Sequence, residues 1–266
     1  MQTSHRDKEL EEALQEALDA GSSVWAVGDI HGHREEFEDL LGRLRLVEGD
    51  IVICIGDLID RGPDSHGVLT IVSESNRIFS IKGNHELLMS EALGGDGHRE
   101  QFWIGRVGGR ATLDSMGSSE SEKRKQARRW LEFTDSLPTE VVLDFFRLAH
   151  SGYRSDIPLE AQSDEDRLKS REVFRATSPL DPKRQVIAGH TPVQMLSNFD
   201  VEPPKEGVWR SPVLMDDGRP AAVLIDTGIA LKDPTHRPRI SAYDLQTGKI
   251  EEVHRKKDPD SKTIML

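Results

Sequence analysis

The stretch Gly28-Asp29-Ile30-His31-Gly32 follows an apolar run at residues 24–27 and places a carboxylate and an imidazole where a strand is expected to end. By itself such a turn is more often structural than functional, because Gly-Asp pairs and single histidines are common at strand ends. The sequence around it therefore decides what this turn does.

The same unit returns twice along the chain. An apolar run at residues 51–55 leads into Gly56-Asp57, and a run at residues 78–81 leads into Gly83-Asn84-His85-Glu86. Apolar residues at helical spacing follow each turn, and this alternation predicts an α/β fold with a mostly parallel sheet. In such a sheet the carboxyl ends of the strands form the ligand-binding edge, so we expect these polar side chains to meet there.

Two later histidines fit the same edge. His150 follows the apolar run at residues 143–149, and His190 follows the run at residues 186–188. Together with the earlier turns they supply carboxylate, amide and imidazole ligands, a set that suits manganese, iron or zinc better than calcium. Two such ions about 3.5–4 Å apart can activate a bridging water and stabilise an in-line displacement at phosphorus. The clusters taken together thus predict a dinuclear metal site.

The rest of the chain is expected to form one domain around this edge. We expect a single domain over residues 1–266, an N-terminal helix within 1–22, a polar helical insertion over 94–137 and a loose tail over 256–266. Further strands are predicted at residues 141–149, 186–188, 223–225 and 240–243. Asp217-Gly218 is typical of a β-hairpin turn, and the charged segment at residues 160–169 is expected to be a solvated loop or helix.

Composition and charge narrow the classes of function. The chain has 266 residues, of which 36% are hydrophobic, so it can bury a sizeable core. Its net charge of −12 argues against a general binder of nucleic acid or anionic membrane, because both need a basic face. The single cysteine, Cys54, cannot form an internal disulfide and is expected in the core. With no signal segment or membrane-spanning run, we expect a cytoplasmic protein.

The set of motifs resembles the phosphoprotein phosphatase family of calcineurin-like metallophosphoesterases, in its bacterial and phage branch of serine/threonine protein phosphatases. The matching segments are Gly28-Asp29-Ile30-His31-Gly32, Gly56-Asp57-Leu58-Ile59-Asp60-Arg61-Gly62, Gly83-Asn84-His85-Glu86, His150-Ser151-Gly152, Gly189-His190-Thr191-Pro192 and Ile225-Asp226-Thr227-Gly228. Their order and spacing agree with the family over about residues 24–253. Ser151 stands where the family usually has Gly or Ala, which affects only the packing of that loop. The resemblance implies an α/β/β/α sandwich with mixed sheets.

The resemblance also implies how two metal ions would be held. Asp29 and His31 would bind the first ion, and Asp57 would bridge both. Asn84, His150 and His190 would complete the shell of the second ion. We expect manganese, with iron or zinc as alternatives, and direct attack on phosphorus by a water or hydroxide that bridges the two metals.

Four further residues take catalytic roles by the same resemblance. His85 would protonate the leaving alkoxide, and Asp60 would orient His85 through a hydrogen bond. Arg61 would bind the non-bridging phosphate oxygens, as a planar bidentate donor does well. The family has a second phosphate-binding arginine, and the segment at residues 168–174 favours Arg171 for it. Arg175, one helical turn away, remains an alternative.

Several other residues receive no role in the chemistry. His33 could face the site, whereas the other histidines lack partner spacing and are predicted at the surface: His5, His66, His98, His236 and His254. Trp25 and Trp130 are expected in the core rather than stacked on a ligand. Asp226 is expected to cap a strand near the site, and Gly108-Gly109 resembles a feature of the bacterial branch to which no chemistry is assigned.

Three functions remain open at this stage. The favoured one is a protein phosphatase for phosphoserine or phosphothreonine, with phosphotyrosine or a small phosphoester as further candidate substrates. We expect a monomer without nucleic-acid or membrane partners. The alternative is a symmetrical diadenosine tetraphosphate hydrolase, but that branch usually lacks the acidic residue at position 60 and has Asp where Glu86 stands. The third is a catalytically silent scaffold, against which the complete set of ligands and His85 argue.

Overall fold

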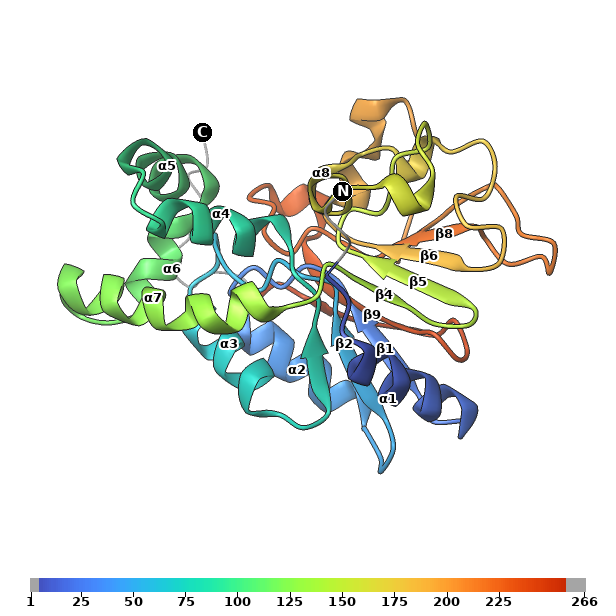
Figure 1. Cartoon of the computed structure of the whole chain (residues 1–266), viewed down its shortest axis with the longest axis horizontal. Coiled ribbons are helices and arrows are strands. Elements are labelled where there is room, and N and C mark those ends of the chain that lie inside the picture. Colours follow the sequence, from blue (N-terminus) through green and yellow to red (C-terminus); the bar gives the residue numbers. More distant parts are fainter. Residues whose placement is uncertain (1–4, 257–266) are drawn as a thin grey trace.

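Two five-stranded mixed sheets lie face to face in the computed structural model, which describes residues 5–256 (Figure 1). The first sheet has the order β10 (Ile250–His254), β9 (Arg239–Asp244), β1 (Val24–Val27), β2 (Ile51–Cys54), β3 (Ile78–Ser80). The second has the order β4 (Glu140–Val142), β5 (Phe146–Ala149), β6 (Gln185–Ala188), β8 (Ala222–Leu224), β7 (Trp209–Arg210). This confirms the predicted sandwich with mixed sheets.

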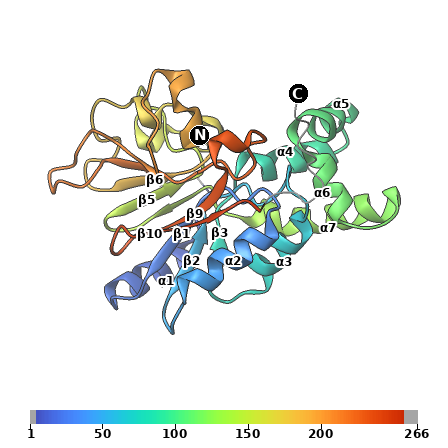
Figure 2. The same ribbon diagram turned by 180° about the vertical axis from the view of Figure 1, so that it is seen from behind.

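Each sheet combines three adjacent parallel strands with two strands that pair antiparallel. In the first, β1, β2 and β3 are parallel, β9 runs antiparallel to β1 and β10 antiparallel to β9. In the second, β5, β6 and β8 are parallel, and β4 and β7 are the antiparallel edge strands. The prediction of parallel strands thus holds for three adjacent strands in each sheet, but the chain divides them between two sheets. Figure 2 shows β9 and β10 beside β1.

The strands are apolar throughout because both of their faces are buried. In β1, Val24 and Ala26 point into the core between the two sheets, whereas Trp25 and Val27 point into the core under the helices. In β6, Ile187 faces the core between the sheets and its two neighbours face the outer core of the second sheet. Side chains of a strand alternate between faces, so a continuous apolar run is what a sandwiched strand requires.

Helices cover the outer face of the first sheet (Figure 1). They are α2 (Arg34–Leu44), α3 (Ser65–Glu74) and α4 (Asn84–Leu93), each of which follows a parallel strand. Their buried residues recur at helical spacing and join the core on that side of the sheet. Helix α1 (Lys8–Asp19), the predicted N-terminal helix, is capped by Asp7 and adds Leu10 and Leu14 to the core between the sheets.

The predicted helical insertion is a group of helices beside α3 and α4 (Figure 1). It contains α5 (Gly97–Phe102), the π-helical turn η1 (Trp103–Val107), α6 (Gly109–Ser115) and α7 (Glu120–Ser136). Helix α7 begins with a capping box formed by Ser119 and Glu122, and Trp130 packs against the core of the first sheet as expected.

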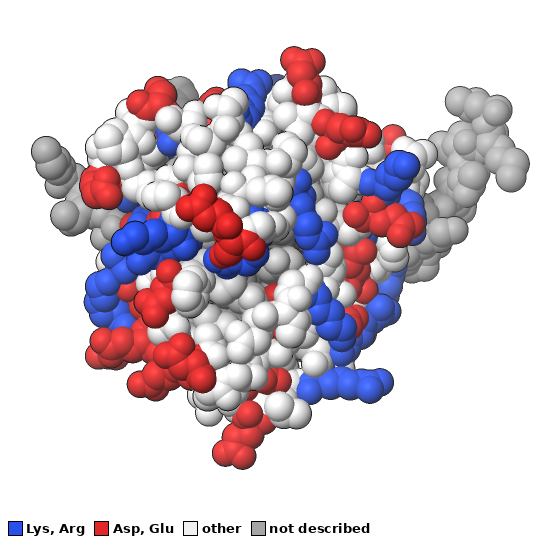
Figure 3. Space-filling model, turned by 90° about the vertical axis from the view of Figure 1, so that its right-hand side faces the viewer, with Lys and Arg blue, Asp and Glu red and all other residues white. Residues whose placement is uncertain are grey.

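Short helical turns and loops cover the outer face of the second sheet. They include η2 (Leu159–Ala161), α8 (Asp164–Lys169), η3 (Val173–Arg175) and η4 (Val193–Phe199), and η5 (Pro234–His236) precedes β9. Of the charged segment at residues 160–169, the second half forms α8, and its Arg167 is buried rather than solvated. Across the side of the molecule that Figure 3 shows, Lys and Arg side chains are interspersed with Asp and Glu.

The structure corrects one local prediction, at residues 141–149, and confirms another, at Asp217-Gly218. The run at residues 141–149 is not one strand but a hairpin, because the chain turns at residues 143–145 and Val141 pairs with Leu148. The turn at Asp217-Gly218 is confirmed, with Gly218 at φ +84° and its N–H donating to the carbonyl of Met215. The predicted tail lies outside the described residues apart from Lys256. Within residues 5–256, no helix combines the length and apolarity needed to cross a membrane.

Candidate active site

The site lies where the parallel strands of both sheets end. The turns after β1 and β2 carry Asp29, His31, Asp57, Asp60 and Arg61, and those after β5 and β6 carry His150 and His190. After β3, the first turn of helix α4 carries Asn84 and His85. The structure brings all of these predicted residues together, although they span more than 160 positions of sequence. Ligands at the carboxyl ends of parallel strands are the general rule for such sheets.

One half of the cluster surrounds His31. Its Nε2 lies 3.9 Å from Oδ2 of Asp29 and 3.7 Å from Oδ2 of Asp57. Its Nδ1 donates to the carbonyl of Ile59 at 2.9 Å, which orients the ring and leaves the lone pair of Nε2 facing the carboxylates. Oδ2 of Asp29 is buried and has no hydrogen-bond partner.

The other half of the cluster surrounds Asn84. Its Oδ1 lies 2.9 Å from Nε2 of His150 and 2.8 Å from Nδ1 of His190. His150 also lies 3.4 Å from Oδ1 of Asp57, which therefore adjoins both halves. Because the Nδ1 of His150 donates to the carbonyl of Ile55, its Nε2 presents a lone pair to the amide oxygen. Acceptors that face one another in this way fit a shared cation.

The protonation of the histidines also fits metal ligation. Burial lowers the pKa of His31 and of His190 well below the ordinary value, and it lowers the pKa of His150 as well. Neutral imidazole is the form that binds a metal. Burial together with Asp226 and Asp57 raises the pKa of Asp29, a crowding of carboxylates that a cation between them would relieve. The donor set and its surroundings therefore fit the predicted pair of ions.

His85 is bonded differently from the other histidines. Its Nδ1 donates to Oδ2 of Asp60 at 2.7 Å, and Asp60 is fully buried. Burial alone would lower the pKa of His85, but the carboxylates of Asp57 and Asp60 outweigh burial and the net shift is upward. A histidine whose Nδ1 is anchored on a buried carboxylate and whose pKa is raised suits a general acid.

Two arginines lie beside the proposed metal ligands. Arg61 is exposed, and its guanidinium lies 2.9 Å from Nε2 of His31 and 2.8 Å from Nε2 of His85. Arg171 donates to Oγ1 of Thr191 at 2.7 Å, directly after His190. Arg175 instead turns toward Glu172, with 3.8 Å between the charged groups. The geometry favours Arg171 over Arg175 for the second arginine.

Backbone strain is concentrated at this site. Eight non-glycine residues in the described part of the chain have positive φ, and five of them carry the predicted chemistry. These five are His31, Asp57, Asp60, Arg61 and His190, with φ between 49° and 72°. Left-handed backbone is unfavourable for such residues, so the surrounding structure must hold it in place.

Three residues hold the site through contacts that the sequence does not predict. Glu86 distinguishes the two branches of the family by its motif, but its role in the structure is to accept from the backbone N–H groups of Asp57, Leu58 and Gly83 at 2.7–3.0 Å through its buried carboxylate. Trp103 and Thr112 of the insertion donate to the carboxylate of Asp60. The motif offered a signal for Glu86, whereas nothing local in the sequence marks the other two.

The residues set aside are mostly where they were expected. Asp226 caps its turn by accepting from the N–H of Gly228, although it is buried beside the site and burial raises its pKa to about 6. His33 is buried against Glu36 rather than turned to the cluster. Of the remaining histidines, His5, His98 and His254 are exposed, whereas His66 and His236 are half-buried. Cys54 and Trp25 lie in the core.

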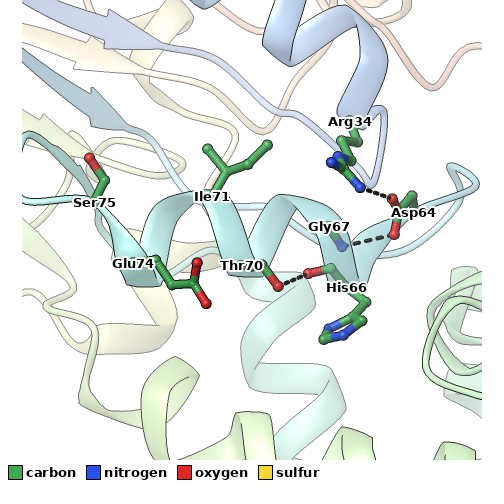
Figure 4. Close-up of a pocket in the computed structure, with 8 residues that line it drawn as sticks. All are labelled: Arg34, Asp64, His66, Gly67, Thr70, Ile71, Glu74 and Ser75. Atoms are coloured by element: carbon green, nitrogen blue, oxygen red, sulfur yellow. Dashed lines mark hydrogen bonds and ion pairs between the residues drawn. The ribbon is translucent and has the colours of Figure 1, made fainter.

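Two hollows in the surface are lined by other sets of residues. The larger, of about 680 Å³, lies along α3 and is lined by Arg34, Asp64, His66, Gly67, Thr70, Ile71, Glu74 and Ser75 (Figure 4). Arg34 and Asp64 on its wall pair with each other, and none of the proposed metal ligands or catalytic residues lines it. The second, of about 420 Å³, is lined by residues that include Arg171 and its neighbours in sequence, but by none of the proposed metal ligands.

Comparisons with known proteins agree with this geometry. Residues 22–224 match the family model described as calcineurin-like phosphoesterase. The chain is 29% identical over 187 residues to serine/threonine-protein phosphatase 1 of Salmonella typhimurium, covering 66% of this chain and 82% of that protein. It is 42% identical to the symmetrical bis(5'-nucleosyl)-tetraphosphatase of Wigglesworthia glossinidia brevipalpis, over only 24% of this chain and 25% of that one. A crystal structure provisionally described as a diadenosine tetraphosphatase superposes with a TM-score of 0.57 at 21% identity, covering 89% and 95% of the two chains.

Proposed function

Because this chain belongs to the calcineurin-like phosphoesterase family, we propose that it is a metal-dependent phosphatase for phosphoserine and phosphothreonine in proteins. The ions would be held by Asp29, His31, Asp57, Asn84, His150 and His190. When bound, they would lower the pKa of water and neutralise charge on the phosphoryl group. Manganese is the expected metal. The match to a serine/threonine-protein phosphatase over most of that protein's length supports the proposal.

The observation that carries the proposal is the pair formed by His85 and Asp60, whose atoms lie 2.7 Å apart. A serine or threonine alkoxide is a poor leaving group and needs a proton as it departs. A nucleoside diphosphate leaves as a stable anion and needs that proton much less. The presence of a positioned proton donor therefore favours a phosphomonoester of an alcohol over a dinucleotide polyphosphate as the substrate.

The two arginines have a complementary task. Arg61 and Arg171 reach the cluster from different turns, so they can hold non-bridging oxygens on different sides of one phosphoryl group. Holding the phosphorus in this way fixes the leaving oxygen relative to His85. Positioning and charge neutralisation account for most of the acceleration expected in phosphoryl transfer to water.

The test compares three substrates on the purified chain with added Mn²⁺: a phosphoserine peptide, diadenosine tetraphosphate and p-nitrophenyl phosphate. We expect phosphate release from the peptide at a kcat/KM above that for ADP release from the nucleotide. Asp60→Asn should reduce turnover of the peptide by about tenfold or more and affect the nucleotide less. Faster ADP release would favour the tetraphosphatase instead, and no turnover of p-nitrophenyl phosphate would favour the scaffold.

A further inference from the structure

Asp60 makes more contacts than its bond to His85 requires. The residue has no exposed surface and adopts φ +72°, so both its side chain and its backbone depend on neighbours to stay in place. One carboxylate oxygen, Oδ2, accepts from His85. Its other oxygen, Oδ1, and its backbone N–H are held by further groups.

Trp103 is the main neighbour of this carboxylate. Its Nε1 donates to Oδ2 at 2.9 Å and lies 3.2 Å from Oδ1, so the indole N–H straddles both oxygens. The side chain is fully buried and belongs to the π-helical turn Trp103–Val107 of the insertion. Turns of this kind are rare and occur often at functional sites.

Thr112 fixes the other oxygen and the backbone together. Its hydroxyl donates to Oδ1 of Asp60 at 2.6 Å and accepts from the N–H of Asp60 at 2.9 Å. Ser65 accepts from the same N–H at 3.1 Å. The insertion thus contributes two donors to one buried carboxylate, and donors of this kind both stabilise the ionised form and set its direction.

The pair Gly108-Gly109 gives this arrangement its close packing. A Cβ on Gly109 would lie 2.3 Å from the nearest atom of the Trp103 indole, so only glycine lets the ring approach the backbone there. The carbonyl of Gly108 accepts from the backbone N–H of Arg61 at 3.3 Å. The glycine pair that had no assigned chemistry therefore packs against Trp103 and against the residue next to Asp60.

We propose that Trp103 is a positioning residue, which together with Thr112 holds the carboxylate of Asp60 in the direction that aligns His85 with the leaving oxygen. The insertion is then part of the machinery that delivers the proton rather than only a cover on the site. This inference rests on the proposed function, because it assigns a purpose to the pair of His85 and Asp60. Tryptophan suits the task, since its indole offers one rigid neutral donor and cannot accept a proton.

The test measures how turnover depends on the leaving group. Wild type and Trp103→Phe are compared on two aryl phosphates. Phenyl phosphate has a poor leaving group, phenolate, whereas the 2,4-dinitrophenolate released from 2,4-dinitrophenyl phosphate departs without being protonated. We expect kcat of Trp103→Phe on phenyl phosphate to fall by about tenfold, the worth of one hydrogen bond to a charged group, and to change little on the dinitrophenyl ester. An equal fall on both esters would mean a general structural defect and would overturn the proposal.

Trp130→Phe is the matched control. Trp130 belongs to the same insertion, and its Nε1 likewise donates to a side chain, Nδ1 of His66 at 3.1 Å, but that histidine lies outside the site. This variant should retain wild-type kcat on both esters. A selective loss on phenyl phosphate in Trp130→Phe would contradict a specific role for Trp103.

A second pair of variants covers the case in which Trp103→Phe does not fold. Thr112→Val removes the donor to Oδ1, whereas Thr112→Ser keeps it. We expect Thr112→Val to show the selective loss on phenyl phosphate and Thr112→Ser to restore most of it. If both behave alike, the positioning role is wrong. Since these assays use aryl esters, they are independent of the phosphopeptide comparison: preference for the dinucleotide would overturn the substrate and leave the positioning result standing.

Discussion

At the scale of single residues, His85 differs from the other histidines of the cluster in the partners of its ring. His31 and His150 donate Nδ1–H to backbone carbonyls, but His85 donates to the carboxylate of Asp60. It also lies close enough to His31 and Asp57 for the three side chains to hold a cation together. General acid and metal ligand are therefore both geometrically possible, and one substitution separates them.

His85→Asn should lower kcat by about two to four decades, because the leaving oxygen loses its proton donor. Metal content measured on the purified variant should match wild type, since the other ligands are intact. Loss of one ion from His85→Asn would instead identify His85 as a ligand and would remove the basis for assigning an acid to this site.

The ligands and the acid could be placed from sequence because each directly follows an apolar run that ends in a turn. Asp29, Asp57 and Asn84 need no knowledge of the fold beyond the rule that parallel strands end at one edge. Trp103 could not be placed in this way. Its contact with Asp60 joins residues 43 positions apart through the packing of an insertion, and the sequence of that insertion is an ordinary polar helical pattern.

At the scale of elements, the turn between β3 and α4 is packed against the turn between β2 and α3. A Cβ on Gly83 would lie 2.2 Å from both the backbone N and Oδ1 of Asp57. Gly83→Ala should therefore displace Asp57, abolish binding of both ions in a metal titration and destabilise the fold by about 1–3 kcal/mol in urea unfolding.

Gly42→Ala is the control for that substitution. Gly42 lies on the exposed side of α2, and a Cβ there would meet no atom within 4 Å. Alanine should raise the free energy of unfolding by about 0.5–1 kcal/mol and leave metal binding unchanged. Normal binding of two ions by Gly83→Ala would show that the turns can move apart without cost.

Elements were predicted well where an apolar run has a clear end. The strands at β1, β2, β6 and β8 and the helix α1 fall where the pattern indicated them. The sequence of the β4–β5 hairpin predicts one strand, because Leu143 and Phe145 continue the apolar pattern through the turn and neither Gly nor Pro interrupts it. A turn made of apolar residues between two short apolar strands therefore leaves no signal in the sequence.

At the scale of the whole molecule, the proposed metal ligands come from both sheets. Asp57 and Asn84 follow strands of the first sheet, whereas His150 and His190 follow strands of the second. A metal bound by residues of both would link the sheets and would bind the folded state only. At 100 times the dissociation constant, such binding adds about 2.7 kcal/mol per site to stability.

We therefore expect Mn²⁺ to raise the midpoint of thermal unfolding and chelation with EDTA to lower it again. Asp57→Asn should show little of this response, because the bridging carboxylate weakens as a ligand for both ions. An unchanged midpoint in protein shown by metal analysis to hold two ions would mean that the ligands do not couple the sheets.

The pairing of β9 with β1 has a consequence for how the chain is made. Val27 pairs with Ala242, so β1 lies inside its sheet but has only β2 beside it until residues 239–244 have been translated. During synthesis that edge of β1 is an open row of backbone hydrogen-bonding groups flanked by apolar side chains. Pairing with β9 closes this edge once residues 239–244 have left the ribosome.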